Sequence, residues 1–200
     1  MSGSVTSIGV AYARTSDPPD LARFLMALLG TVFQPRTPGR FPMSFVTTRD
    51  WEVRIETSLK DEDDRGTNMR MLERFLVASY GELELAVDLH DIGMIEAVLR
   101  PEAAVSAVLL DLSDNQLFPK WNQARSTAVE KAIRDLLISW YEQSPFRAAF
   151  ADHEAEFDID PLELRADNNP YALLAMPAEM KDAGPLEFHQ GGWLLSPVTS

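Results

Sequence analysis

The residues of this chain that can do chemistry are mostly carboxylates, and their densest run lies at residues 154–160. Four acids alternate there with apolar residues: Glu154, Glu156, Asp158 and Asp160. Alternate residues of a strand share a face, so the spacing predicts a strand with four carboxylates on one side. Like charges held this close repel each other, and a basic partner would relieve the repulsion. A solvated edge strand that uses charge to avoid aggregation is the alternative interpretation.

A second acidic run, Asp61-Glu62-Asp63-Asp64, comes just before a predicted helix. Acids at that position stabilise the positive end of the helix dipole, which is a sufficient structural reason for them. The two acidic runs could nevertheless lie together in the fold, so Asp61, Glu62, Asp63 and Asp64 are also candidates for partner binding. Trp193, after two glycines, is a candidate interface anchor, with a place in the core as the alternative.

Other kinds of site find little support in the residues. The histidines, His90, His153 and His189, do not form an H-E-x-x-H pair, and the acidic run lacks the glycine and distal glutamate of a calcium loop. The chain has no cysteine, no G-x-S-x-G nucleophile motif and no glycine-rich phosphate loop. We therefore predict no metal, no cofactor and no catalytic residue. A pair of carboxylates brought together from distant segments is the enzymatic alternative.

Net charge and apolar content limit the partners. The net charge is −13, yet 46% of the residues are apolar, which is enough to fold. Residues 151–200 hold ten acids and two bases, so this part would attract a basic protein. A nucleic acid or an anionic membrane requires a basic surface that the sequence lacks. The start of the chain has no basic leader, and its apolar stretches are too short to span a bilayer, so we expect a cytoplasmic protein.

Hydrophobic periodicity predicts the elements that must position these residues. The predicted strands are 4–13, one or two within 44–57, 82–89, 94–100, 105–112 and 154–160. The predicted helices are 16–33, 67–80 and 122–142. Prolines at 161, 170, 177, 185 and 197 suggest that the tail consists of loops and short segments.

This order predicts a single α+β domain. Three strands follow one another without helices between 82 and 112, which favours a mixed or mostly antiparallel sheet over a doubly wound one. We expect about five to seven strands, with three main helices packed largely on one side. Residues 1–145 would form the core, and residues 146–200 an acidic, proline-rich extension packed on the same domain.

The function predicted from this character is protein binding without catalysis. A small acidic bacterial protein with no cofactor motif and no cysteine fits best an immunity protein, which would bind and neutralise a cognate, basic toxin domain. Matched charge would speed that association. The alternatives are a small carboxylate-dependent enzyme, with a concave pocket, and an adaptor or structural subunit, with an exposed apolar patch.

The acidic run at residues 154–160 generates a first prediction. Changing Glu154, Glu156, Asp158 and Asp160 together to their amides should slow association with the partner strongly at low salt and leave the fold intact, because the acids share one field. Stopped-flow association rates of the variant and the parent protein test it. Single substitutions should have smaller effects, and an unchanged rate for the fourfold variant would refute the idea.

Overall fold

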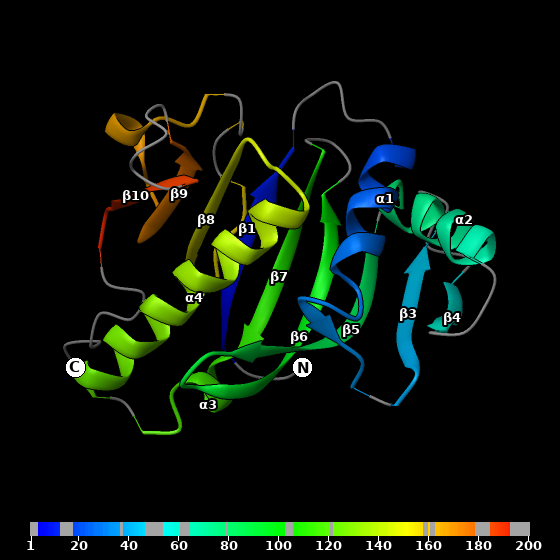
Figure 1. Ribbon diagram of the computed structural model, residues 1–200, viewed down its shortest axis with the longest axis horizontal. Helices are drawn as coiled ribbons and strands as arrows, with labels where there is room; N and C mark the ends of the chain where they lie inside the picture. Colours follow the sequence, from blue (N-terminus) through cyan, green and yellow to red (C-terminus); the bar gives the residue numbers. More distant parts are fainter. Residues whose placement is uncertain are drawn as a thin grey trace.

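The computed structural model describes residues 4–12, 18–36, 38–46, 54–60, 65–78, 80–102, 106–120, 122–157, 160, 163–178 and 185–192. Ten strands of this described chain form one sheet in the order β10-β9-β8-β1-β7-β6-β5-β3-β4, with β2 beside β5 (Figure 1). The strands are β1 Val5–Ala11, β2 Phe33–Gln34, β3 Arg40–Val46, β4 Arg54–Lys60, β5 Tyr80–Leu89, β6 Gly93–Glu102, β7 Ala107–Ser113, β8 Ala148–His153, β9 Leu173–Pro177 and β10 Leu186–Gln190.

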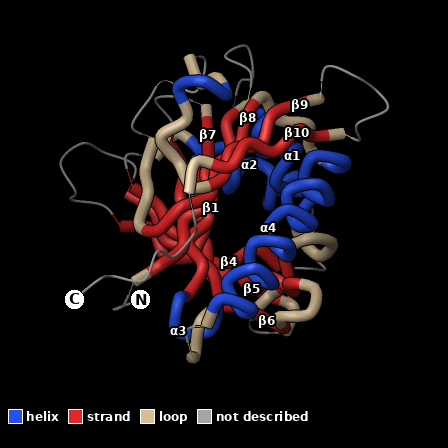
Figure 2. Tube along the Cα trace, turned by 90° about the vertical axis from the view of Figure 1, so that its left-hand side faces the viewer, coloured by secondary structure: helices blue, strands red, loops and turns tan. Residues whose placement is uncertain are grey.

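Three long helices cover one side of the sheet. The helices are α1 Pro18–Leu28, α2 Arg65–Leu76, the short α3 Asp114–Leu117 and α4 Gln123–Gln143. Figure 2 shows α1 and α4 on the same side of the strands. Leu25 of α1, Leu72 of α2 and Trp140 of α4 belong to one buried cluster with side chains of the strands, so we call this side of the sheet the helix face. None of the described helices is long and apolar enough to cross a membrane.

The prediction of a single α+β domain with three main helices is confirmed, but the predicted sheet was too small. The described sheet has ten strands where five to seven were expected, and its strand pairings are antiparallel where a mixture was allowed. The additional strands are short: β2 has two residues, and β9 and β10 have five each. Segments of this length carry too little periodicity to be recognised, and they form because a neighbouring strand offers hydrogen bonds.

The predicted extension, residues 146–200, supplies three strands of the sheet. Its first strand, β8, pairs with β1, and β9 and β10 continue the sheet outward from it. The division of the chain at residue 145 stays a prediction. The strand predicted over 154–160 is wrong, because β8 ends at His153 and Glu154 turns the chain with a φ of 49°. Ala155 and Phe157 nevertheless point inward, as their alternation with acids predicted.

A smaller apolar cluster covers part of the opposite side of the sheet. The ring of Phe150 in β8 lies directly on Gly9 of β1, where an added Cβ would come within 2.2 Å of its Cε1 atom. Tyr171 stacks on Phe150 with ring centroids 3.8 Å apart, and Phe157 meets the same ring edge-on. Ala155, Phe157, Leu164 and Tyr171 therefore cover β1, β7 and β8 on this side, a region that we call the covered half.

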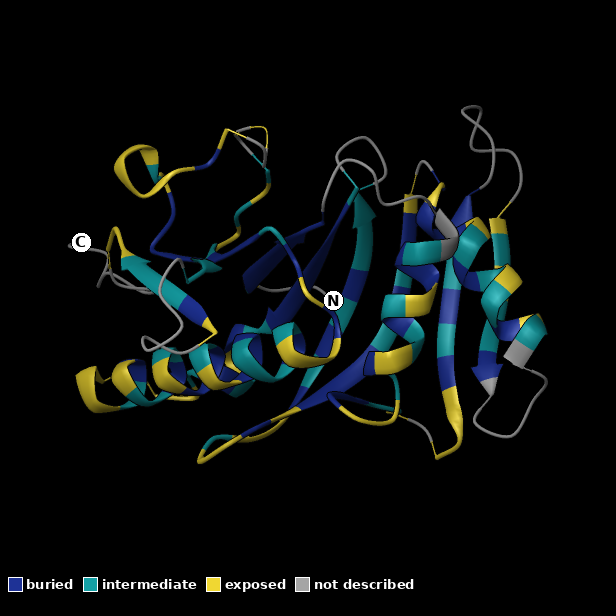
Figure 3. Cartoon of the chain, turned by 45° about the horizontal axis from the view of Figure 1, so that its top comes forward, coloured by how far each residue is buried: buried dark blue, intermediate teal, exposed yellow. Residues whose placement is uncertain are grey.

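The burial of the strands reflects this arrangement. The central strands β1 and β7 are buried along almost their whole length, whereas β5 alternates between buried and half-exposed residues (Figure 3). The strand predicted over 105–112 is β7, and it is buried on both faces, as a central strand is. The alternation in β5 means that only one of its sides has a cover within the described chain.

Tyr12 connects β1 to the end of α4 inside the core. Its hydroxyl accepts a hydrogen bond from Nε1 of Trp140 at 3.0 Å and shares another with Oγ of Ser144 at 2.8 Å. Burial raises the pKa of Tyr12 to about 12, and the hydrogen bonds with Ser144 and Trp140 oppose that rise. Because the fold favours the neutral phenol, the free energy of unfolding falls as the pH rises through the alkaline range.

Tyr12→Phe should destabilise the fold by about 1–3 kcal/mol below pH 10, because it leaves two buried polar groups without their partner. In the parent protein the contribution of Tyr12 is fully present below its unfolded pKa of about 10. It is lost at about 1.4 kcal/mol per pH unit as the pH rises toward the folded value of about 12. Urea unfolding at several pH values tests both points. The stability difference between the two proteins should shrink from pH 10 upward, and a constant difference would contradict the assignment.

Candidate binding face

The uncovered part of the sheet carries a concentration of carboxylates. On β3, β4, β5 and β6, side chains that alternate with the buried core residues point away from the helices, and we call this surface the open face. Its acids are Glu56, Glu82, Glu84, Asp88, Glu96 and Glu102, joined by Glu156 from the segment after β8. Its bases are Arg36, Arg40, Arg54 and Arg100. Acids therefore outnumber bases by seven to four among the side chains described on this surface.

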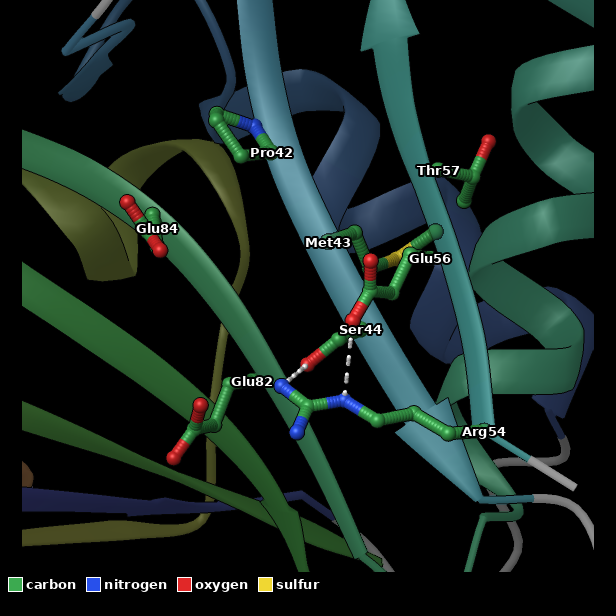
Figure 4. A pocket seen from close by; sticks show the side chains of 8 residues that line it. All are labelled: Pro42, Met43, Ser44, Arg54, Glu56, Thr57, Glu82 and Glu84. Carbon is green, nitrogen blue, oxygen red and sulfur yellow. Dashed lines mark hydrogen bonds and ion pairs between the residues drawn. The ribbon is translucent and has the colours of Figure 1, made fainter.

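Antiparallel register brings acids of separate strands side by side. Ser44 of β3 lies opposite Glu56 of β4 on one side and opposite Glu82 of β5 on the other. These residues line a shallow hollow of about 350 Å³, shown in Figure 4 with Glu82 and Glu84 projecting from β5. Arg54 bonds Oγ of Ser44 at 3.3 Å and lies 3.4 Å from Oε1 of Glu56. The hollow is thus lined by three carboxylates and by the guanidinium of Arg54.

Arg36, just after β2, crosses two strands of the same face. Its guanidinium lies 3.0 Å from Oε2 of Glu84 in β5 and 3.1 Å from Oε1 of Glu96 in β6. A second hollow of about 320 Å³ borders this pair and includes Met94. Glu84 lines both hollows, so they form one continuous strip along the sheet. The strip is well exposed, and each ion pair in it contributes little to stability by itself.

Arg100 marks the boundary between the open face and the covered half. Its Nε donates to Asp111 at 2.7 Å, and Asp111, which is 8% exposed, also accepts a hydrogen bond from the Ser7 hydroxyl at 2.8 Å. Burial alone would lower the pKa of Arg100, but the hydrogen bond and charge of Asp111, with Glu102 and Glu156, raise it above its ordinary value. Arg100 therefore makes its closest contact with a buried acid, and it only partly compensates the negative charge of the other acids around it.

Two neighbours of Arg100 have raised pKa values, and burial is the largest cause for both. Burial raises the pKa of Glu102 above its ordinary value; Arg100 opposes the rise, and Glu156 and Asp111 add to it. Burial also raises the pKa of Tyr80, whose hydroxyl donates to Glu82. A cation placed on this part of the face would lower both pKa values, so the surface is electrostatically prepared for a basic group.

Of the acids predicted to bind a partner, the structure brings one to the open face. Glu156 lies 3.9 Å from Nη1 of Arg100. Glu154 instead donates its backbone N–H to Val5, and the carbonyl of Asp160 accepts from Glu163. The other candidates lie outside the described residues: Asp61, Glu62, Asp63, Asp64, Asp158 and Trp193. Their role in binding stays a prediction.

The sequence analysis missed the acids of the strands. The alternation of Glu82 and Glu84 with leucines predicts the strand at 82–89, but by itself it does not identify these acids as part of a binding site. The signal that could have found the face is the repetition of Glu82 and Glu84 at alternate positions in β5, together with acids on the same side of β4 and β6. It becomes a surface only through the register between strands, which no single segment reveals.

Of the three histidines, His153 makes a structural contact with a buried acid. Nδ1 of His153 lies 3.0 Å from Oδ2 of the buried Asp114, whose other oxygen accepts the Thr6 hydroxyl at 2.7 Å. These contacts tie β8 and β1 to the start of α3. His90 is exposed beside Asp91. Among the described residues, no group of three or more histidines and acids is arranged to hold a metal ion.

Comparisons with known proteins identify the family. Among curated proteins, none matches the sequence. One similar solved structure is the Pseudomonas aeruginosa T6SS protein PA0821, with 10% identity and a TM-score of 0.32 over 88% of this chain; the chain spans 59% of that protein. The sequence profile described as Immunity protein 64 matches residues 52–199, which include β4 to β10. The prediction of an immunity protein, and not an enzyme, is confirmed by this match. The chain belongs to the Immunity protein 64 family.

Proposed function

We propose that this immunity protein neutralises its cognate toxin by placing the open face against a basic surface of the toxin domain. The observation that carries the proposal is the convergence of carboxylates from three strands and the segment after β8 on one uncovered side of the sheet. The family supplies the toxin as the partner. The location of the contact surface and the basic character of the toxin are our inferences, as is the cytoplasm as the place of action.

The charges of the face favour rapid association. Three of its arginines are engaged with acids of the protein itself: Arg36 with Glu84 and Glu96, Arg54 with Glu56, and Arg100 with Asp111. The remaining negative charge is distributed over neighbouring strands, so its field extends beyond any single side chain. Such a field steers a basic protein toward the face and raises the association rate by about 10- to 1000-fold at low ionic strength.

A larger hollow elsewhere offers a second surface. It measures about 640 Å³ and lies between α4, the β2 segment and the β5–β6 turn. Its lining mixes apolar Val32 and Leu136 with only two acids, Asp88 and Asp135. The open face has the greater charge and the larger run of adjacent strands, so we assign the toxin to the open face. Acids on the helices then serve as the matched comparison.

Neutralising three acids of the open face should slow toxin binding at least about tenfold at low ionic strength. The variant carries Glu56→Gln, Glu84→Gln and Glu96→Gln. Its control carries Asp20→Asn, Asp135→Asn and Glu142→Gln on the helices, which removes the same charge from the other side. The toxin is first captured from the protein's own organism and identified; stopped-flow rates with the purified toxin domain then compare the three proteins.

The control should bind about as fast as the parent protein, and high salt should reduce the difference between the two variants. Equal slowing by both variants would mean that only the net charge matters and would overturn the assignment to the open face. Slowing by the helix variant alone would mean that the toxin contacts the helix side of the protein. Co-expression with active toxin provides the cellular readout, in which the open-face variant should protect least.

Toxin binding should also depend on pH through Glu102. Because the pKa of Glu102 is raised in the free protein, its carboxyl group still holds a proton at a pH where an ordinary glutamate has lost it. A basic partner favours the ionised form, so affinity should rise as the pH increases through this raised pKa. Glu102→Gln should flatten that rise, as measured by isothermal titration calorimetry across the acidic range. An unchanged pH profile would place Glu102 outside the contact.

A further inference from the structure

Two large apolar side chains are exposed at opposite ends of the open face. The exposed large apolar residues of the described chain are Val77 at 58%, Tyr80 at 36% and Met94 at 55%. Tyr80 lies at the start of β5, two residues before Glu82, and Met94 lies near the start of β6, two residues before Glu96. Residues two apart in a strand share a side, so Tyr80 and Met94 both belong to the open face.

We propose that Tyr80 and Met94 are the apolar anchors of the toxin interface, each entering an apolar recess in the basic surface of the toxin domain. This inference rests on the proposed function and names the residues that hold the complex together once it has formed. The partner surface that fits is a basic strip with an apolar recess at each end. The acids between the anchors determine how fast the proteins meet, and the anchors determine how long they stay together.

The separation of the two anchors matches one interface. Met94 lies opposite Asp88, eight residues along β5 from Tyr80. At about 3.3 Å per residue, the two side chains are roughly 26 Å apart. A stable interface buries about 800 Å² on each partner, which corresponds to a round patch roughly 32 Å across. Both anchors and the acidic strip between them therefore fit within one contact of ordinary size.

Tyr80 has the properties of an anchor whose position is fixed in advance. Its hydroxyl donates to Glu82 on the same strand, which holds the ring over the face before any partner arrives. Burial and the neighbouring Glu82 raise the pKa of Tyr80, so the phenol stays neutral and presents an uncharged ring. Tyrosine is enriched among the residues that dominate interface energies, and a ring already oriented loses little entropy on binding.

Met94 offers an adaptable apolar contact at the other end. It follows Gly93, whose φ of 106° completes the turn between β5 and β6, and it opposes Asp88 in the register. Met94 lines the second hollow of the open face and also the hollow beside α4, so it stands at the rim between them. A flexible thioether can adjust to a recess whose shape differs from its own.

The test separates dissociation from association with the purified toxin domain used above. We expect Tyr80→Ala to raise the dissociation rate about 30-fold and Met94→Ala about 10-fold, with association rates within about twofold of the parent. Tyr80→Phe keeps the ring and should retain most of the lifetime. Val77→Ala is the matched control, because Val77 is equally apolar and more exposed but follows α2 outside the open face.

A second measurement does not depend on the stability of the alanine variants. The chain has no cysteine, so Tyr80→Cys, Met94→Cys and Val77→Cys each create a unique thiol. Bound toxin should slow maleimide labelling at positions 80 and 94 by about tenfold or more and leave labelling at position 77 unchanged.

The outcomes distinguish this inference from the proposed function. Unchanged dissociation and unprotected thiols at 80 and 94, with slowed association for the Glu56, Glu84 and Glu96 variant, would overturn the anchors and leave the open face standing. Unchanged behaviour in every variant would overturn both. Protection at 80 and 94 with faster dissociation of their alanine variants, and none at 77, would support the anchors.

Discussion

Helices cover only one face of this sheet, and the rest of the structure depends on that one-sided packing. The helix face buries the long side chains of α1, α2 and α4, as Leu25, Leu72 and Trp140 show. Because strand residues alternate, every apolar residue that points to the helices fixes a neighbour that points the other way. The opposite side is closed by Phe150 and Tyr171 over its covered half, and its remaining part must be polar to be stable in water.

The Arg100–Asp111 pair lies at the border between the covered half and the open face. Asp111 is buried and would be costly without Arg100 and Ser7 as partners. The pair lets a charged surface begin directly beside an apolar cluster without leaving a buried charge alone. Glu156, which comes from the segment over the covered half, reaches the open face at this point. One group of side chains thus joins the covered half to the open face.

Sequence patterns predicted what one segment determines by itself. The helix face of α4 and the alternation of β5 follow from local periodicity, and Val129, Ile133 and Leu85 are buried as expected. The prediction that the first helix continues to residue 33 is wrong, because Gly30, with a φ of 79°, ends the helix after Leu28 and the apolar pattern continues into β2. The strands β9 and β10, and the gathering of acids on the open face, depend on pairing between distant segments, which no local pattern contains.

Ten antiparallel strands also give the protein a definite curvature. Each strand is rotated by roughly 20–25° from its neighbour, so the four strands that form the open face turn through about 60–75°. The face is therefore a saddle and not a flat plate. For the contact proposed above, two partner surfaces with the same basic charge but different contour would not fit the face equally well. In that proposal, shape discriminates between related toxins even when their electrostatic potentials are alike.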